Sequence, residues 1–340
     1  MKIVVLAGGL SPERDVSLST GTQVCNALRQ IGQQAILVDL FYGEETLPAP
    51  IENAFLGNES LAPRPVKTAA PDLAAVRASR ADSGLGGVGK NVIELCKAAD
   101  IVFMAMHGIP GENGMLQAMF DMMEIKYTGA GYFGSALAMD KAVTKELFRA
   151  HGILTPEGRL FKKGEKVAFP LPCIVKPCSG GSSIGVTKAY TPQALAAAAE
   201  AAFRCEDNIL VETFYPGREF TCGILGGQAL PPAEVIPKGD FYDYEHKYQN
   251  GLITEICPAQ IPEALTRELM ETSLKAFDAL SLSVYARMDY IYSGDGRLFC
   301  LEANTLPGMT PTSHFPQMAR AAGMDYASLC MKIIELSLAK

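Results

Sequence analysis

The sequence lacks the features that mark membrane, secreted and nucleic-acid-binding proteins. No stretch approaches 18 consecutive apolar residues, and residues 1–9 contain too few apolar side chains for a secretory signal. A formal net charge of −7 provides no basic field for nucleic acid or for an anionic membrane surface. We therefore expect a cytoplasmic protein whose partners are small molecules, with no nucleic acid and no membrane among them.

Cysteine is present but shows no pattern. The nine cysteines are scattered along the chain and none forms a C-x-x-C pair, so the sequence predicts neither a zinc site nor a disulfide framework. We expect buried, reduced thiols. With 340 residues, 48% of them hydrophobic, the chain is long enough for two or three globular domains.

The first part of the chain alternates strands with helices. Apolar runs predict strands over residues 2–7, 35–40 and 101–106, and a helix over residues 17–31, which is typical of an open α/β sheet. Between residues 43 and 90 the periodicity fades and prolines and glycines accumulate. We interpret that stretch as a surface insertion.

Two glycine motifs leave a second function open. Residues 84–90 nearly match a phosphate-binding loop, but Asn91 stands where Ser or Thr must reach the metal, and no strand precedes the motif. Gly129, Gly131 and Gly134 form a G-x-G-x-x-G motif between a short predicted strand and a helix. This motif allows a dinucleotide-binding oxidoreductase, and the alternative is an interdomain turn.

The second part of the chain has a different organisation. Short strands follow one another closely, which predicts a mostly antiparallel α+β region. The strand over residues 173–176 ends in Lys176, and a glycine-serine loop over residues 178–185 follows it. Such a loop can present backbone amides to a phosphate, although it is more often only a flexible turn. The polar, aromatic-rich residues 238–253 have a length typical of a lid.

The most informative segment is a predicted hairpin near the C-terminus. Two apolar runs flank Asp295-Gly296, a dipeptide typical of a two-residue type I′ turn. This turn would set Asp289 directly opposite Glu302. Arg287 would then face Asn304, with all four side chains on one face of the sheet. We interpret this face as a site where magnesium holds a nucleotide's phosphates. The alternative is a solvated face with cross-strand charge pairs.

These motifs, in this order, resemble those of the ATP-grasp superfamily. They are Lys-Pro at 176–177, Gly-Ser-Ser-Ile-Gly at 181–185, Arg-x-Asp at 287–289 and Glu-x-Asn-Thr-x-Pro-Gly at 302–308. Two further stretches are similar to signatures of D-alanine-D-alanine ligases, namely Ser-Pro-Glu-Arg-Asp-Val-Ser at 11–17 and His-Gly-Ile-Pro-Gly-Glu-Asn-Gly at 107–114.

The resemblance implies an α/β and α+β multidomain protein. An N-terminal open α/β (pre-ATP-grasp) sheet over residues 1–139, carrying the 43–90 insertion, would bind substrate. A two-subdomain ATP-grasp fold would follow, with a central subdomain over residues 140–216 and a C-terminal one over residues 217–340. The latter would carry the lid loop at residues 238–253.

The resemblance also implies a nucleotide site. Lys141 and Lys176 would contact the phosphates of ATP, with Ser182 and Ser183 in the loop that covers them, and Lys247 would reach the γ-phosphate as the lid closes. The residues that would frame the adenine and the ribose are Glu212, Thr213, Phe214, Tyr215 and Glu219. Two Mg²⁺ (or Mn²⁺) ions would be held by Asp289, Glu302 and Asn304.

The implied substrate site binds two amino acids. Glu13 would bind the ammonium group of the first D-alanine, and His107 would lie near its carboxylate. Arg287, Ser313 and the backbone around Gly308 would receive the second substrate and the oxyanion. The remaining implied side chains come from the loops: Ser182 and Tyr248 would hydrogen-bond with Glu13, and Tyr242 would line the substrate.

The implied activity is ATP-dependent ligation of two D-alanines through D-alanyl phosphate, for peptidoglycan precursor synthesis, by a homodimer. Lys247-Tyr248 resembles the dipeptide-forming members of the family. His314 departs from the pattern, because relatives that use D-alanine generally carry an apolar residue there. A D-alanine-D-serine ligase therefore remains an alternative.

The lid interpretation predicts the effect of one substitution. Lys247→Ala should lower kcat far more than it weakens binding of the first D-alanine, because this lysine is expected to act only when the lid closes. Steady-state kinetics of the variant measure both quantities, and unchanged turnover would exclude the lid assignment.

Overall fold

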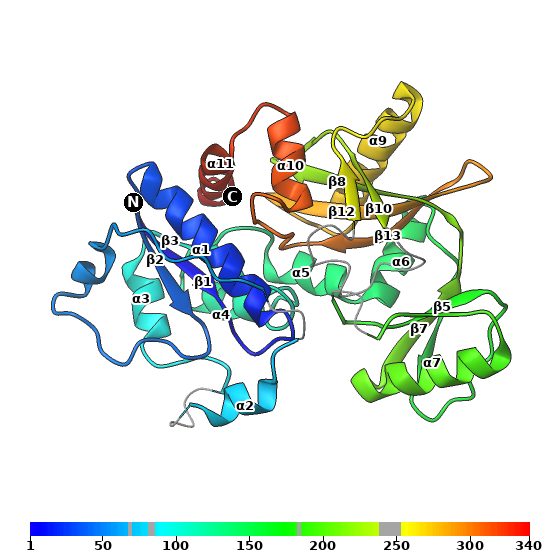
Figure 1. Ribbon diagram of the computed structural model, residues 1–340, viewed down its shortest axis with the longest axis horizontal. Coiled ribbons are helices and arrows are strands. Elements are labelled where there is room, and N and C mark those ends of the chain that lie inside the picture. Colours follow the sequence, from blue (N-terminus) through cyan, green and yellow to red (C-terminus); the bar gives the residue numbers. More distant parts are fainter. Residues whose placement is uncertain (67–69, 81–85, 182–184, 238–252) are drawn as a thin grey trace.

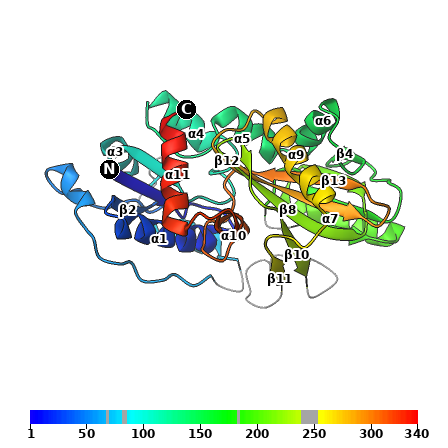
Figure 2. The ribbon, with the colours of Figure 1, turned by 90° about the horizontal axis from the view of Figure 1, so that it is seen from above.

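The computed structural model describes residues 1–66, 70–80, 86–181, 185–237 and 253–340 (Figure 1). Over these residues the strands form a three-stranded, a four-stranded and a six-stranded sheet. Figures 1 and 2 show the three-stranded sheet at one end of the molecule and the four-stranded sheet toward the other, with the six-stranded sheet between them. The predicted α/β and α+β multidomain fold is confirmed. No helix in the described ranges is long and apolar enough to cross a membrane.

The N-terminal sheet is parallel and has the strand order β2-β1-β3. Strand β1 (Lys2–Ala7) matches its predicted bounds, and it lies between β2 (Gln34–Asp39) and β3 (Ile101–Met104). The chain leaves the sheet after Met104, so the third strand is two residues shorter than predicted. Helix α1 (Arg14–Gln30) packs against β1 and β2, and it begins where the chain leaves β1. This brings the start of α1 to the carboxyl edge of the sheet, where parallel sheets bind ligands.

The stretch between residues 43 and 90 is anchored to the N-terminal sheet. A bridge between Gly43 and Lys90 closes it. A Cβ atom on Gly89 would lie 2.5 Å from the Gly43 nitrogen, so the glycine permits this close approach. The short helix η1 (Ile51–Phe55) inserts Phe55, which has no exposed surface, into the core beside β2. The near-match to a phosphate loop lies partly outside the described residues.

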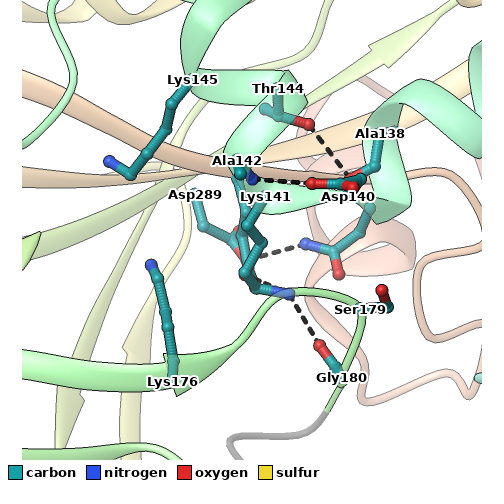
Figure 3. A network of polar contacts seen from close by, with 12 residues as sticks. Ala138, Asp140, Lys141, Ala142, Thr144, Lys145, Lys176, Ser179, Gly180 and Asp289 are labelled. Atoms are coloured by element: carbon teal, nitrogen blue, oxygen red, sulfur yellow. Dashed lines mark hydrogen bonds and ion pairs between the residues drawn. The ribbon is translucent and has the colours of Figure 1, made fainter. Parts of the chain in front are cut away.

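The helices that follow along the chain lead into its second half. They are α2 (Leu73–Ala78), α3 (Val92–Ala98), α4 (Met115–Met122), α5 (Tyr132–Met139) and α6 (Lys141–Ala150). Helix α6 begins at the N-cap Asp140, whose side chain accepts hydrogen bonds from the Ala142 and Val143 amides (Figure 3). This cap satisfies two amides that the helix leaves unpaired.

The four-stranded sheet is antiparallel and has the order β4-β7-β5-β6. Its strands are β4 (Gly158–Lys162), β5 (Cys173–Pro177), β6 (Thr187–Ala189) and β7 (Asn208–Thr213). Helix α7 (Pro192–Cys205) packs against it, and begins at Thr191 with proline in its first turn. Small alanine side chains on α7 allow this close packing.

The six-stranded sheet is also antiparallel. Its strands are β8 (Gly217–Leu225), β9 (Gln228–Ala229), β10 (Ala233–Pro237), β11 (Ile253–Ile256), β12 (Tyr285–Ser293) and β13 (Leu298–Asn304). Helix α9 (Glu263–Ala279) packs on it. The chain returns to the N-terminal sheet through α10 (His314–Ala321) and α11 (Tyr326–Leu338), and α11 packs against α1.

In the β12–β13 hairpin the turn differs from the predicted one, whereas the predicted residue pairs are present. The Ser293 amide bonds the Arg297 carbonyl, so the turn contains three residues rather than two, with Gly296 at a φ of +82°. This turn shifts the register by one. A β-bulge at Leu301 then shifts it back, so Asp289 pairs with Glu302 as predicted.

One substitution tests the docking of the 43–90 stretch. Phe55→Ala should lower the free energy of unfolding by about 3–5 kcal/mol, because it leaves a cavity in the core. Leu56→Ala is the matched control. Its side chain is 60% exposed, so we expect a change within about 0.5 kcal/mol. Urea denaturation measures both, and equal small losses would contradict the docking.

Candidate active site

A cavity of about 1070 Å³ lies where the three sheets meet. Its lining comes from the start of α1, the loops after β3 and β13, and the facing sides of β5, β7, β8, β12 and β13. Fifteen of the predicted site residues line it. They are Glu13, His107, Lys141, Lys176, Glu212, Thr213, Phe214, Tyr215, Glu219, Arg287, Asp289, Glu302, Asn304, Gly308 and Ser313. The other five, Ser182, Ser183, Tyr242, Lys247 and Tyr248, lie outside the described residues.

The hairpin supplies two opposed carboxylates to the cavity. The Asp289 carboxylate accepts two hydrogen bonds from the Arg287 guanidinium group, both at 2.8 Å, and one from the side-chain amide of Asn304 at 2.9 Å. Glu302 lies 3.4 Å from the Lys141 ammonium group. The bulge at Leu301 places both Leu301 and Glu302 on the cavity face. The acidic side chains are therefore held by neighbouring cations.

These residues fit a divalent cation bound together with a phosphate ligand. Asp289, Glu302 and Asn304 offer carboxylate and amide oxygens, which Mg²⁺ prefers. Within the described ranges, no group of three or more His, Cys, Asp or Glu side chains is arranged to hold a metal. Phosphate oxygens of a nucleotide would complete the coordination shell, as is usual for Mg²⁺ sites.

Lysines face the carboxylates from the opposite side. The Lys141 ammonium group donates to the Gly180 carbonyl at 2.6 Å, which ties α6 to the glycine-serine loop (Figure 3). Lys176 lies 2.5 Å from Glu212, which also contacts the buried Lys145. Burial raises the pKa of Glu212, but the charges of Lys176 and Lys145 outweigh it and hold this pKa below its usual value. Glu212 is therefore ionised.

The aromatic residues after β7 form the wall beside this lysine cluster. The Tyr215 ring stacks on Phe299 with a centroid separation of 4.1 Å. Phe214 packs edge-on against Tyr190, and the Lys188 ammonium group lies 4.7 Å from the Phe214 ring centroid. These contacts fix the segment that the sequence predicts to frame an adenine.

The N-terminal part of the chain contributes the polar end of the cavity. Glu13 is the N-cap residue of α1, but its side chain makes no capping hydrogen bond, so helix capping does not explain it. A Cβ atom on Gly181 would lie 2.8 Å from a Glu13 carboxylate oxygen, which shows how closely the glycine-serine loop approaches. His107 lies 3.1 Å from the Thr20 hydroxyl. Burial lowers the pKa of His107, although Glu13 partly opposes this effect.

The far end of the cavity contains Ser313 and His314. A Cβ atom on Gly308 would lie 2.9 Å from the Ser313 hydroxyl oxygen, so glycine leaves the backbone open to this side chain. His314 lies 2.6 Å from Glu255 on β11. Burial raises the pKa of Glu255, but the hydrogen bond and charge interaction with His314 outweigh burial, so this pKa lies below its usual value. A histidine in contact with a carboxylate therefore stands where an apolar side chain was the expectation for D-alanine.

Three polar residues near the site were missed by the sequence analysis. Glu112 lies within the quoted His107 motif and received no role, and Glu255 lies in a strand that carries no motif. Lys145 lies one helical turn after Lys141, and this i,i+4 spacing was the available signal. Their importance depends on contacts between distant segments, which no local pattern reveals.

The glycines of the dinucleotide alternative have structural roles instead. The Gly129 amide donates to the Ser337 hydroxyl, and the Lys340 ammonium group donates to the Gly129 carbonyl. A Cβ atom on Gly134 would lie 2.7 Å from the Ser281 carbonyl. None of the three glycines lines the cavity, so the alternative interpretation of this motif, a turn, accounts for them.

Comparisons with known proteins agree with this geometry. Residues 2–130 match the family model for the D-ala D-ala ligase N-terminus, and residues 146–335 match that for the C-terminus. The D-alanine–D-alanine ligase of Pediococcus pentosaceus is 41% identical, over 98% of this chain and 97% of its own. That of Lacticaseibacillus casei is 40% identical, over 98% of this chain and 95% of its own.

Solved structures give the same result. The D-alanine–D-alanine ligase of Bacillus anthracis complexed with ATP has a TM-score of 0.76 at 28% identity, over 100% of this chain and 98% of its own. The Coxiella burnetii enzyme has a TM-score of 0.76 at 25% identity, over 100% of this chain and 94% of its own. The chain therefore belongs to the D-alanine–D-alanine ligase family.

Proposed function

We propose that the chain joins two D-alanines into D-alanyl-D-alanine at the expense of ATP, for peptidoglycan precursor synthesis. The observation that carries the proposal is the cavity itself. One end holds Glu13 and His107, the middle holds opposed carboxylates, and the other side holds Lys141 and Lys176. An amino acid and a nucleotide triphosphate need these complementary charges. Because the reaction consumes ATP, we place the enzyme in the cytoplasm.

The reaction has two chemical steps. The carboxylate of the first D-alanine attacks the γ-phosphorus, the bond to the bridging oxygen breaks, and ADP leaves. The amine of the second D-alanine then attacks the carbonyl carbon of the resulting D-alanyl phosphate. Phosphate leaves with the carbon–oxygen bonding pair, and the nitrogen releases a proton. Each step depends on holding the reactants in line, which is the contribution of the cavity walls.

The side chains divide this work by charge. Lys141 and Lys176 would bind phosphate oxygens, and Ser182, Ser183 and Lys247 would cover them. Arg287 is held in place by Asp289, and we infer that it stabilises the oxyanion of the second step together with the backbone at Gly308. Phe214, Tyr215 and Glu219 would bind the nucleoside.

We infer that Asp289, Glu302 and Asn304 hold magnesium or manganese together with the nucleotide. When bound, the metal supplies positive charge at the triphosphate. The chain's own part is to keep the two carboxylates opposed. The strand register does this by pairing Asp289 with Glu302.

Glu112 adjusts the charge at the amino-acid end. Burial, with the added effect of Glu13, raises the pKa of Glu112 to about 8. Its carboxyl group accepts a hydrogen bond from the Gly108 amide at 2.6 Å. A second negative charge beside Glu13 is therefore disfavoured. We infer that Glu13 supplies the negative charge that pairs with the substrate ammonium group.

The first test measures phosphate release from Mg-ATP with D-alanine, followed by identification of the product by mass. We expect phosphate release coupled to D-alanyl-D-alanine. Parallel reactions with D-alanine plus D-serine or D-lactate show how the His314–Glu255 pair affects choice of the second substrate. A dominant D-alanyl-D-serine product would favour the D-serine alternative, and no D-alanine-dependent release would exclude the ligase.

We further propose a homodimer that uses the exposed faces of α4 and α5. These adjacent helices carry exposed apolar side chains, Met115, Met122, Tyr132 and Phe133, and the Met122 side chain is 89% exposed. Apolar patches of this kind commonly mark protein interfaces. A second copy of the chain would cover them in a two-fold arrangement.

Light scattering tests the homodimer. The native protein should have twice the chain mass of 36.4 kDa. The Met122→Glu variant should have the mass of a single chain, because the substitution would bury a charge in the interface. Leu56→Glu places the same charge at another exposed apolar residue and should leave the dimer intact. A native monomer, or an undisturbed Met122→Glu dimer, would contradict this interface.

A further inference from the structure

Lys145 is a wholly buried lysine with no part in the cavity surface. Its side chain has no exposed area, and its ammonium group contacts three oxygens. These are the Thr155 hydroxyl at 2.7 Å, the Pro156 carbonyl at 3.0 Å and a Glu212 carboxylate oxygen at 2.8 Å. Burying an ammonium group is costly unless it is paired, and lysine is among the residues least often buried. The position therefore calls for a physical explanation.

Glu212 lies between two lysines and binds each through a different oxygen. One oxygen lies 2.5 Å from Lys176 and the other 2.8 Å from Lys145. Lys176 lines the cavity, whereas Lys145 does not. Figure 3 shows the two lysine side chains extending toward each other from α6 and β5. The three groups together carry one net positive charge, and the only one of the two lysines that faces the cavity is Lys176.

Removing Lys145 would change the charge that the cavity presents. Glu212 would then pair with Lys176 alone, and the two charges would cancel. Burial lowers the pKa of Lys145 to about 8, so its ionised form is retained at neutral pH only with the help of Glu212. The carboxylate and the buried lysine therefore stabilise each other's charged state.

Lys145 also touches the segment that joins the two antiparallel sheets. The Leu154 carbonyl accepts a hydrogen bond from the Cys300 amide of β13, and the Glu157 carbonyl accepts one from the Thr213 amide at the end of β7. Thr155 and Pro156 lie between these two attachments and are held by Lys145. The ammonium group thus fixes Glu212 relative to both sheets.

We propose that Lys145 is a positioning residue for the phosphate end of the cavity: by sharing the charge of Glu212, it leaves Lys176 with net positive charge toward an anionic ligand. This inference rests on the proposed function only in taking that ligand to be the phosphates of ATP. The roles are separate, since Lys176 touches the ligand and Lys145 acts through Glu212.

The test compares a charged ligand with an uncharged one. Dissociation constants of ATP and adenosine, both without divalent metal, are measured by calorimetry for the native protein and for Lys145→Met. We expect ATP to bind about tenfold or more weakly to the variant, which is about 1.4 kcal/mol. Adenosine should change by less than about threefold, because it has no phosphate and because Glu212 keeps its contact with Lys176 in the variant. A purely structural role would weaken both ligands equally, and that result would overturn the proposal.

Lys163→Met is the matched control. It removes the same charge from an exposed lysine that pairs with Asp207, and its side chain is 61% exposed. We expect both ligands to bind it as they bind the native protein. An equal loss of ATP affinity in the control would show that total charge, rather than Lys145, decides the result, and would overturn the proposal.

A second background keeps the test decisive if Lys145→Met does not fold. Glu212→Gln removes the charge that Lys145 shares, so adding Lys145→Met to it should leave the ratio of ATP to adenosine affinity within about twofold of the Glu212→Gln value. A further tenfold fall in that ratio would overturn the charge-sharing argument.

Failure of this proposal is distinguishable from failure of the ligase. The native protein's D-alanine-dependent phosphate release tests the ligase alone. Native ATP binding that is unaffected by Lys145→Met would overturn the role of Lys145 and leave the ligase assignment unchanged.

Discussion

Charge balance across the cavity is the constraint on which the site depends. Its walls bring acidic and basic side chains together at a junction between sheets, and burying either sign alone would be costly. Pairing balances these charges: Arg287 lies beside Asp289, Lys141 beside Glu302 and Lys176 beside Glu212, and His314 contacts Glu255. Arg287 and Asp289 lie on the same strand, whereas the partners in the other three pairs come from different elements, so those three pairs also hold the cavity walls in place. A ligand with both charges can then exchange partners with the walls.

The location of the cavity follows from the three sheets. The parallel N-terminal sheet ends its strands at one edge, where Glu13 and His107 enter the cavity. The two antiparallel sheets instead contribute alternate residues of their strands, because successive side chains point to opposite faces. In β12 this places Arg287 and Asp289 in the cavity and Met288 in the core. One end is therefore built from loops, and the remainder from regular strands.

The hairpin shows how far the sequence predicts this arrangement and where it stops. The pairing of Asp289 with Glu302 is confirmed, although the hairpin departs from the prediction at two positions whose effects on the register cancel. The turn has one residue more than predicted, and the bulge at Leu301 adds one to the other strand. Turn residues and alternation are local signals, whereas a bulge depends on neighbouring strands and is not visible in composition. The roles of Lys145 and Glu255 were missed for the same reason, because their partners come from distant segments.

Helix α6 shows what the charge balance costs locally. Lys141 occupies its first turn, where the helix dipole disfavours a cation, and Lys145 lies one turn later, where a like charge is unfavourable. Asp140 offsets part of this cost by capping the helix. The rest is offset by tertiary contacts, since Lys141 reaches Glu302 and Lys145 reaches Glu212. The two lysines are unfavourable for the isolated helix, and two separate carboxylates stabilise them only in the folded protein. Such a conflict between local preference and tertiary structure is expected at a functional site. These two contacts also connect α6 to the six-stranded sheet through Glu302 and to the four-stranded sheet through Glu212.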